Sequence, residues 1–275
     1  MSKDADTIIV PVGDYHSGSN YALFLNRFWE GGKGVNHRPT SKQEKIRSQF
    51  EIACKQIAQA RKGKRLILVH NGDAVDGDHH HSGDVCTVNI KEQVDIHTEL
   101  MIETKKRMNW QRGDKLYYTT GTDVHTGETE EGIAEQMDAE MNGDRHVFDE
   151  LRLPVNGKQL HFVHHGPGSG NGANEGNPVR NWLKNIYYDS LKENDQPPDI
   201  VYSAHTHNPV MSVFEHRNKM LFGLMYGIIS PSMQIKTRYA HQRAPVKKNK
   251  VGMVYQEIKA DGTICIPVFS VTEVV

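Results

Sequence analysis

Short apolar runs rich in strand-forming residues recur along the first two thirds of the chain. Residues 7–12 form a short apolar run, and residues 65–73 begin with an apolar run that leads into Asn-Gly-Asp, which is typical of strands buried on both faces. The pattern predicts five such strands, over residues 7–12, 65–73, 115–121, 158–166 and 199–204.

Helices are predicted between these strands. Apolar residues from Ile46 to Ala60 fall at helical spacing after a capping-box pattern that begins at Ser41, and this helix is expected to end near Lys62. The Asn177-Pro178 pair predicts a cap followed by proline at the first helical position. The remaining expected helices cover residues 90–108, 130–141 and 177–192.

The last quarter of the chain changes to paired apolar segments. Residues 209–228 predict a hairpin around Arg217-Asn218, and residues 251–258 with 263–271 predict another around Asp261-Gly262. Alternation of strands and helices followed by hairpins predicts a layered α/β fold with mixed sheets and helices outside. No linker divides the chain, so we expect one domain over residues 1–275, with an exposed glycine-rich loop at 164–178.

Composition narrows the class of protein. With 33 basic and 34 acidic residues the formal net charge is −1, so no global field draws the chain to nucleic acid or membrane, although a local patch would suffice. Cys54, Cys86 and Cys265 lie far apart without CxxC pairing, which argues against disulfides or a thiolate metal site. The first apolar run is too short for a signal or membrane segment. We therefore expect a cytoplasmic protein without membrane contact.

Polar side chains of metal-binding type follow each predicted strand. Most of the 16 histidines lie in or beside these short motifs. In open α/β sheets, ligands bind outside the carboxyl ends of the strands, so we expect one convergent polar site. Its candidates, in chain order, are Asp14 and His16, Asp73 and Asp76, Asp123 and His125, His164 and His165, and His205 and His207.

Imidazole and carboxylate without thiolate favour Mn²⁺, Fe or Zn²⁺. The candidates are too many for a single tetrahedral ion. A pair of ions about 3.5–4 Å apart that shares a bridging carboxylate would use them all. The sequence therefore predicts a dinuclear metal centre, with Mn²⁺ the first expectation and Fe or Zn²⁺ the alternatives.

These motifs resemble, in order, those of the calcineurin-like metallophosphoesterase superfamily. That family has the pattern DxH, GDxxD, GNH(D/E), a histidine before glycine at a strand end, and GHxH. The corresponding segments here, which span roughly residues 7–210, are DYH at 14–16, GDAVD at 72–76, GTDVH at 121–125, HGP at 165–167 and AHTH at 204–207. The resemblance implies a four-layer αββα sandwich that holds two metals and hydrolyses phosphate monoesters or diesters.

The resemblance also implies roles for individual residues. The first metal would be held by Asp14, His16 and His207, and the second by His165 and His205, while Asp73 would bridge the two. The family's chemistry is attack on phosphorus by a hydroxide that the two metals activate. Asp73 is thus expected to serve the catalysis as well as the metals.

The third motif departs from the family. Where the family has an asparagine ligand followed at once by a catalytic histidine, this chain has Thr122-Asp123-Val124-His125. We interpret Asp123 as the ligand and His125 as the general acid or phosphate-orienting residue. Thr122 is the alternative counterpart of the asparagine.

The fourth motif offers two neighbouring histidines. On an extended strand His164 and His165 would point to opposite sides, so that only one binds metal. The match to His-Gly-Pro favours His165 and leaves His164 packed or beside the ligands.

Three segments suggest contacts to substrate. His79 or His80 in the polar loop 76–84, and Arg180 after the glycine-rich loop, are candidates for binding phosphate. The alternatives are a solvated loop and a charge on a helix surface. The basic stretch at 236–250, which includes Tyr239, favours a nucleic-acid surface or, alternatively, a solvated face.

The resulting hypothesis is a metal-dependent phosphoesterase that hydrolyses phosphodiester bonds in nucleic acid (DNA or RNA) or nucleotides. One alternative is a phosphomonoesterase acting on nucleotides or phosphoproteins. Another, from a different class, is a metal-binding scaffold without catalysis.

Overall fold

The computed structural model describes residues 5–25, 29–30, 36–77, 84–123, 129–217, 222–237 and 249–274. One mixed sheet of the described residues has the strand order β13-β12-β1-β4-β5-β6. The strands β1, β4, β5 and β6 are parallel, whereas β12 runs antiparallel to both β1 and β13. Their bounds are β1 (Thr7–Val12), β4 (Arg65–Asn71), β5 (Lys115–Thr119), β6 (Val147–Phe148), β12 (Asn249–Ile258) and β13 (Val268–Val274).

The second mixed sheet has the order β10-β11-β9-β8-β7. Here β8, β9 and β11 are parallel, and the pairs β7–β8 and β10–β11 are antiparallel. A small separate ribbon pairs β2 (Trp29–Glu30) with β3 (Asn36–His37). The bounds of the second sheet are β7 (Leu151–Val155), β8 (Lys158–Phe162), β9 (Ile200–Ser203), β10 (Val210–Arg217) and β11 (Phe222–Ile229).

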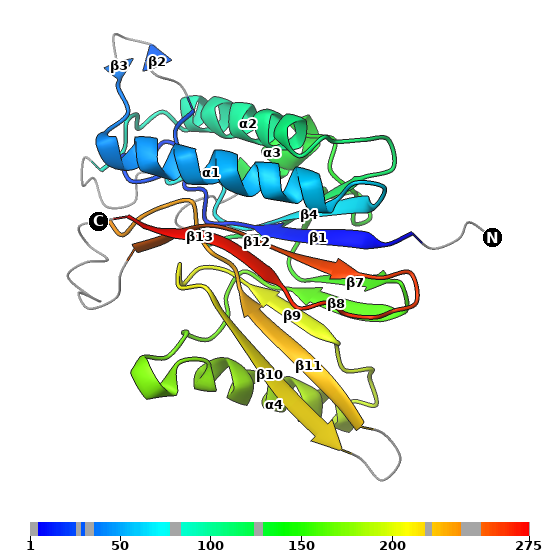
Figure 1. Ribbon diagram of the computed structural model, residues 1–275. Helices are drawn as coiled ribbons and strands as arrows, with labels where there is room; N and C mark the ends of the chain where they lie inside the picture. Colours follow the sequence, from blue (N-terminus) through cyan, green and yellow to red (C-terminus); the bar gives the residue numbers. More distant parts are fainter. Residues whose placement is uncertain are drawn as a thin grey trace.

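Helices cover the outer faces of both sheets, so the chain forms four layers (Figure 1). The first sheet carries α1 (Ser41–Ala60), α2 (Ile90–Arg107) and α3 (Thr129–Gln136). The second sheet carries α4 (Asn177–Lys192), which follows a short 3₁₀ helix at Gly172–Asn174. The predicted α/β sandwich of two mixed sheets flanked by helices is confirmed. Among the described residues, no helix combines the length and the apolar character that crossing a membrane requires.

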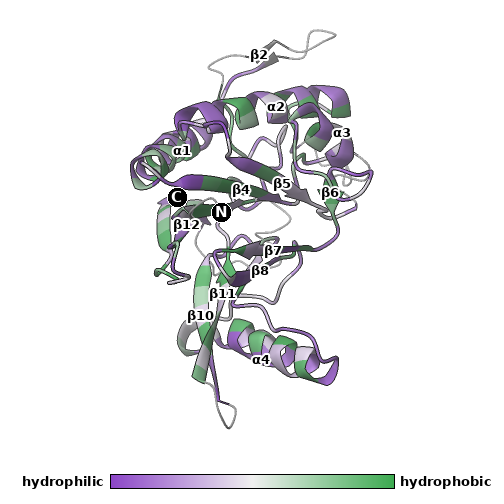
Figure 2. Cartoon of the chain, turned by 90° about the vertical axis from the view of Figure 1, so that its right-hand side faces the viewer, coloured by the Kyte–Doolittle hydropathy of each residue, from purple (hydrophilic) through white to green (hydrophobic). Residues whose placement is uncertain are grey.

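Three hydrophobic cores lie between these layers. Along β1, Ile8 and Val10 pack toward the helices, whereas Ile9 faces the second sheet. Along β9, Tyr202 faces the first sheet and Val201 packs under α4. Because successive residues of a strand point to opposite faces, strands in the two middle layers bury apolar residues on both faces. In Figure 2 green stretches of the strands lie between helices of mixed colour.

Two helix starts differ from the prediction by one residue. The N-cap of α1 is Thr40, not Ser41: Gln43 N donates to the Thr40 hydroxyl at 3.2 Å, and Thr40 N donates to Gln43 Oε1 at 3.1 Å. Gln43 is fully buried, and its amide nitrogen donates to Ala22 O, so a tertiary contact selects this register. The N-cap of α4 is Gly176, with φ of 84°, rather than Asn177.

Two other elements differ from the prediction. The helix expected over residues 130–141 ends at Gln136, since Asp138 has a left-handed φ of 53° and Glu140 N donates to Leu116 O of β5. The strand β7 was not predicted, although Asn156-Gly157 forms a tight turn between β7 and β8. Pro154 argues against a central strand, but β7 lies at the sheet edge, where proline is tolerated.

A buried ion pair lies at one end of the first sheet, where β4 and β5 begin. The Arg61 guanidinium, at the end of α1, donates to both oxygens of Asp114, at 2.5 and 3.0 Å. Both side chains are almost fully buried. Asp114 also accepts a hydrogen bond from Leu66 N at the start of β4. The pair therefore joins a helix to two strands.

We expect Arg61→Met to lower the free energy of unfolding by about 3–5 kcal/mol, because it leaves the Asp114 carboxylate buried without its partner. Urea unfolding followed by circular dichroism measures this change. The matched control is Arg152→Met, which removes the exposed pair with Asp195 and should change stability far less, because water screens that pair. If the two variants lowered the free energy of unfolding equally, the stabilising role of the buried Arg61–Asp114 pair would be contradicted.

Candidate metal centre

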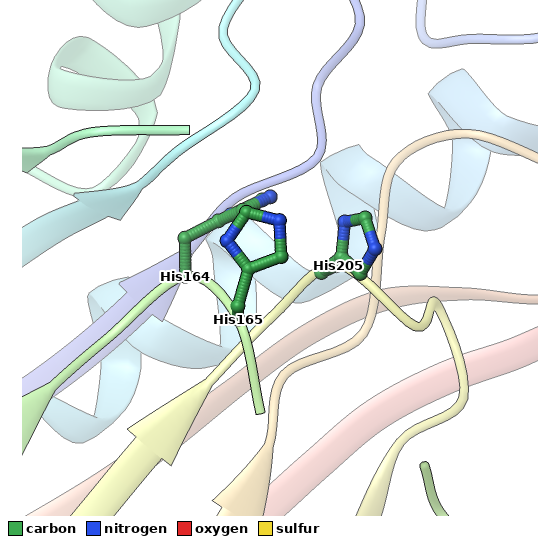
Figure 3. Close-up of side chains that lie close together, drawn as sticks. All are labelled: His164, His165 and His205. Atoms are coloured by element: carbon green, nitrogen blue, oxygen red, sulfur yellow. The ribbon is translucent and has the colours of Figure 1, made fainter. Parts of the chain in front are cut away.

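The loops that follow β1, β4, β5, β8 and β9 meet at one edge of the two sheets. Parallel pairing of β1, β4 and β5, and of β8 with β9, turns their carboxyl ends in the same direction. Figure 3 shows His164 and His165 from the end of β8 beside His205 from the end of β9. The convergence expected from the sequence is therefore present.

Residues at this edge hold unusual backbone conformations. Left-handed φ values between 43° and 66° occur at Asp14, His16, Asp73, His205 and His207. Such values are uncommon outside glycine and cost free energy, so the surroundings must enforce them. Main-chain hydrogen bonds do so: Asp14 N donates to Gly72 O, and His16 N to Asp73 O, both at 3.0 Å.

One group of candidate ligands consists of Asp14, His16 and His207. The three residues each offer a ligand atom, and these atoms all lie within 4.8 Å of one another. Asp14 is fully buried, and His207 Nε2 lies 3.4 Å from Asp14 Oδ1. Burial raises the pKa of Asp14, but the charge and hydrogen bond of His207 outweigh it and lower the pKa overall. Asp14 therefore stays anionic, as a metal ligand would need to be.

A second group consists of His164, His165 and His205, again within 4.8 Å (Figure 3). The strand β8 ends at Phe162, so the two neighbouring histidines are not on an extended strand and the expectation of opposite directions does not apply. Their ring centroids are 4.8 Å apart. His164 is buried and His165 is exposed. Both imidazoles thus belong to the centre, and which of them binds metal stays a prediction.

Asp73 lies between the two groups. Its Oδ2 is 3.1 Å from His164 Nε2 and 3.7 Å from His16 Nε2. It also forms a third close group with Asp14 and His164. Only 1% of Asp73 is exposed, so this carboxylate is placed to be shared by ions on either side.

The third motif places Thr122, rather than Asp123, at the centre. The Thr122 hydroxyl lies 3.3 Å from Asp73 Oδ2, 3.3 Å from His164 Nε2 and 3.5 Å from His205 Nδ1. Asp123 is exposed and joins none of the three close groups. The geometry favours Thr122 as the counterpart of the family's asparagine, and the ligand role of Asp123 stays a prediction. The predicted catalytic residue His125 lies outside the described residues.

The predicted substrate contacts are not at the centre or are not described. His79 and His80, and residues 238–248 of the basic stretch, lie outside the described residues. Arg180 is exposed on α4 and lines a cavity of about 550 Å³ between α4 and β10, together with Lys184 and Arg217. None of these three cations lines the cavity beside the histidines.

A cavity of about 460 Å³ adjoins His164 and His165, between the end of β8 and α4. Trp182 and Ile186 form an apolar part of its wall. No sequence pattern predicts this cavity, because its lining comes from segments far apart in the chain. Besides its histidines, the ionisable residues that line it are Asp149, Glu150, Asp189, Glu193 and a single arginine, Arg152.

His164 is held in one orientation by hydrogen bonds at both ring nitrogens. Its Nδ1 lies 2.7 Å from the carbonyl oxygen of Asn71, so Nδ1 carries a proton and donates it, and Nε2 faces Asp73. Burial lowers the pKa of His164, but the bond to Asp73 and the charges of Asp14 and Asp73 prevail and raise the pKa to about 9. Without a cation, His164 therefore keeps a second proton at neutral pH.

Comparisons with known proteins find similarity of fold only. No family model matches the chain, and no curated protein sequence matches it. A Streptococcus pneumoniae TIGR4 protein described as a predicted phosphoesterase is 8% identical with a TM-score of 0.32, over 98% of both chains. A Thermotoga maritima protein is 12% identical with a TM-score of 0.34, over 97% of this chain and 99% of its own.

The 5′-nucleotidase of Candida albicans SC5314 is 15% identical with a TM-score of 0.39. The alignment covers 98% of this chain and 51% of the nucleotidase. Likenesses at these TM-scores carry no argument about function.

We expect binding of Mn²⁺ to release a proton from His164, because a ligand imidazole must be neutral. The pKa of about 9 means that affinity for Mn²⁺ rises with pH up to that value. Calorimetry at pH 7.5 in two buffers of different ionisation enthalpy counts the protons released. His164→Asn should release about one proton fewer than the wild type.

The control is His161→Asn, a buried histidine that bonds to Glu150 outside the centre. It should leave proton release unchanged. Equal proton release by His164→Asn and the wild type would show that His164 does not lose its proton to the metal.

Proposed function

We propose that this chain is a metal-dependent phosphoesterase with two divalent cations. One cation would be held by Asp14, His16 and His207, and the other by His164, His165 and His205. The observation that carries this proposal is the buried Asp73 carboxylate, which lies between the two groups.

The donor set fits such cations. The groups contain carboxylate oxygens and imidazole nitrogens without thiolate, which favours Mn²⁺, Fe or Zn²⁺. Asp14 and Asp73 are almost fully buried, and buried charges in proteins are paired or coordinate metals. Histidines paired with these carboxylates supply that compensation when no cation is bound. Mn²⁺ is the first expectation.

When bound, two such cations neutralise charge on the phosphoryl oxygens and lower the pKa of the attacking water. The residues of the chain orient the ligands. Asn71 O fixes the tautomer of His164, and Thr122 N donates to Asp73 Oδ1 at 2.7 Å, which fixes the plane of that carboxylate. His125 remains the predicted proton donor to the leaving group.

We propose a phosphodiester with a compact organic group, of nucleotide size or smaller, as the substrate. A cavity of about 460 Å³ is within the range of small-molecule sites, and Trp182 offers an aromatic surface. The carboxylates that line this cavity repel a second phosphate, which disfavours a nucleic-acid strand on that side. DNA or RNA is the alternative, supported by the basic stretch at 236–250, and a phosphomonoester is the other.

The test is hydrolysis of bis-p-nitrophenyl phosphate beside p-nitrophenyl phosphate by metal-stripped protein reloaded with Mn²⁺. We expect the diester to be cleaved, and Asp73→Asn to lower kcat by about 100-fold or more, because the shared carboxylate is lost. The control is Asp261→Asn, an exposed carboxylate beside the turn between β7 and β8, at the opposite edge of the sheets.

Other outcomes of these assays would favour the alternative functions. Preference for the monoester would move the assignment to a phosphomonoesterase. Faster cleavage of single-stranded DNA than of the p-nitrophenyl ester of thymidine monophosphate would favour the nucleic-acid alternative. Two bound cations without turnover of any ester would put the scaffold hypothesis ahead.

A further inference from the structure

A buried carboxylate outside the candidate ligand groups joins two loops of the metal centre. Glu130 lies in the first turn of α3, and 2% of it is exposed. Its Oε2 accepts a hydrogen bond from Gly121 N at 2.7 Å, and its Oε1 accepts one from Ala74 N at 3.2 Å. Gly121 directly precedes Thr122, and Ala74 directly follows Asp73.

The two loops touch at these residues. A Cβ atom on Gly121 would lie 2.3 Å from Asp73 N and 2.5 Å from Asp73 Oδ1, so no other residue fits there without a shift of the backbone. Thr122 N donates to Asp73 Oδ1 at 2.7 Å. The place at which Gly121 is held therefore determines how Thr122 meets Asp73.

Two other pairs of neighbouring loops are joined by hydrogen bonds between their main chains. The loop after β1 donates to the loop after β4, from Asp14 N to Gly72 O and from His16 N to Asp73 O, and Ala204 N donates to His164 O. Between the loops after β4 and β5, the observed links involve side chains: Thr122 with Asp73, and Glu130 with both loops. The last residues of the two strands, Thr119 and Asn71, are also joined through their side chains.

A carboxylate suits this position because both groups that it meets are N–H donors. Two oxygens in one plane accept both hydrogen bonds, whereas glutamine would place its NH₂ group against one of the N–H groups. Leaving a buried donor unsatisfied is unfavourable. Burial, partly offset by these two hydrogen bonds, raises the pKa of Glu130 to about 7.

We propose that Glu130 is a positioning residue, which holds Asp73 and Thr122 in the arrangement that shared cation binding needs. It acts through the main chain of Ala74 and Gly121 and does not itself contact cation or substrate. The inference rests on the proposed two-cation site, but concerns how this chain builds it.

The chain offers a matched control in the next residue. Glu131 lies in the same turn of α3 and also accepts two main-chain hydrogen bonds, from His146 N at 2.6 Å and Val147 N at 3.2 Å. These donors lie at the start of β6 and not in a loop of the metal centre. Glu131→Gln therefore reports the structural effect of the same chemical change.

The experiment measures Mn²⁺ binding by calorimetry and the electron paramagnetic resonance spectrum of the loaded protein, beside thermal unfolding of the metal-free protein. We expect Glu130→Gln to weaken binding of at least one Mn²⁺ by about 10–100-fold and to diminish the signal of the spin-coupled pair. Glu131→Gln should keep the affinities and the coupled signal of the wild type, even if its melting temperature falls as much as that of Glu130→Gln.

Two results would overturn the inference: wild-type Mn²⁺ binding and coupling in Glu130→Gln, or equal weakening in both variants at equal loss of stability. If Glu130→Gln does not fold, Glu130→Asp replaces it, because it keeps the carboxylate but is shorter by one methylene. It should fold with weakened coupling, and unchanged coupling in it would overturn the inference. Failure of the proposed function is distinct: the wild type would bind two Mn²⁺ and hydrolyse no ester.

Discussion

The buried carboxylate of Asp73 is the constraint on which the rest of the centre depends. A carboxylate with 1% exposure is unfavourable unless hydrogen bonds and positive charge compensate it. The chain supplies both, because Thr122 N donates to Oδ1 and the imidazoles of His16 and His164 approach Oδ2 from two sides. Asp73 and these three partners come from four of the five loops.

The fold makes that arrangement possible by its parallel strands. Strands buried on both faces are rigid, and their carboxyl ends deliver a carboxylate or an imidazole from each loop to one edge. The loops themselves are strained, with left-handed backbone at Asp14, Asp73 and His205. Hydrogen bonds between the loops stabilise these strained conformations, and strained backbone of this kind is common at functional sites.

Much of this could be predicted from the sequence. The five central strands were predicted because continuous apolar runs report burial on both faces, and the convergence of the motifs follows from parallel pairing. The edge strand β7 was missed because its alternating burial and Pro154 do not resemble a central strand. The end of α3 was missed because Leu116 O, distant in the chain, binds Glu140 N.

The details of the centre depend on contacts that no local pattern contains. Thr122 comes close to the histidines because Gly121 packs against Asp73, and His164 turns toward Asp73 because Asn71 O accepts its Nδ1 proton. Glu130 fits an ordinary helical pattern, since the N–H groups that it binds lie in two distant loops. The acidic cavity likewise combines residues of the segment 149–163 with residues of α4.

The proposed function requires that two cations share Asp73. Anomalous diffraction from crystals soaked in Mn²⁺ tests it most directly. We expect two peaks about 3.5–4 Å apart, one on each side of the Asp73 carboxylate. A single peak, or a pair of peaks that leaves Asp73 uncoordinated, would contradict it.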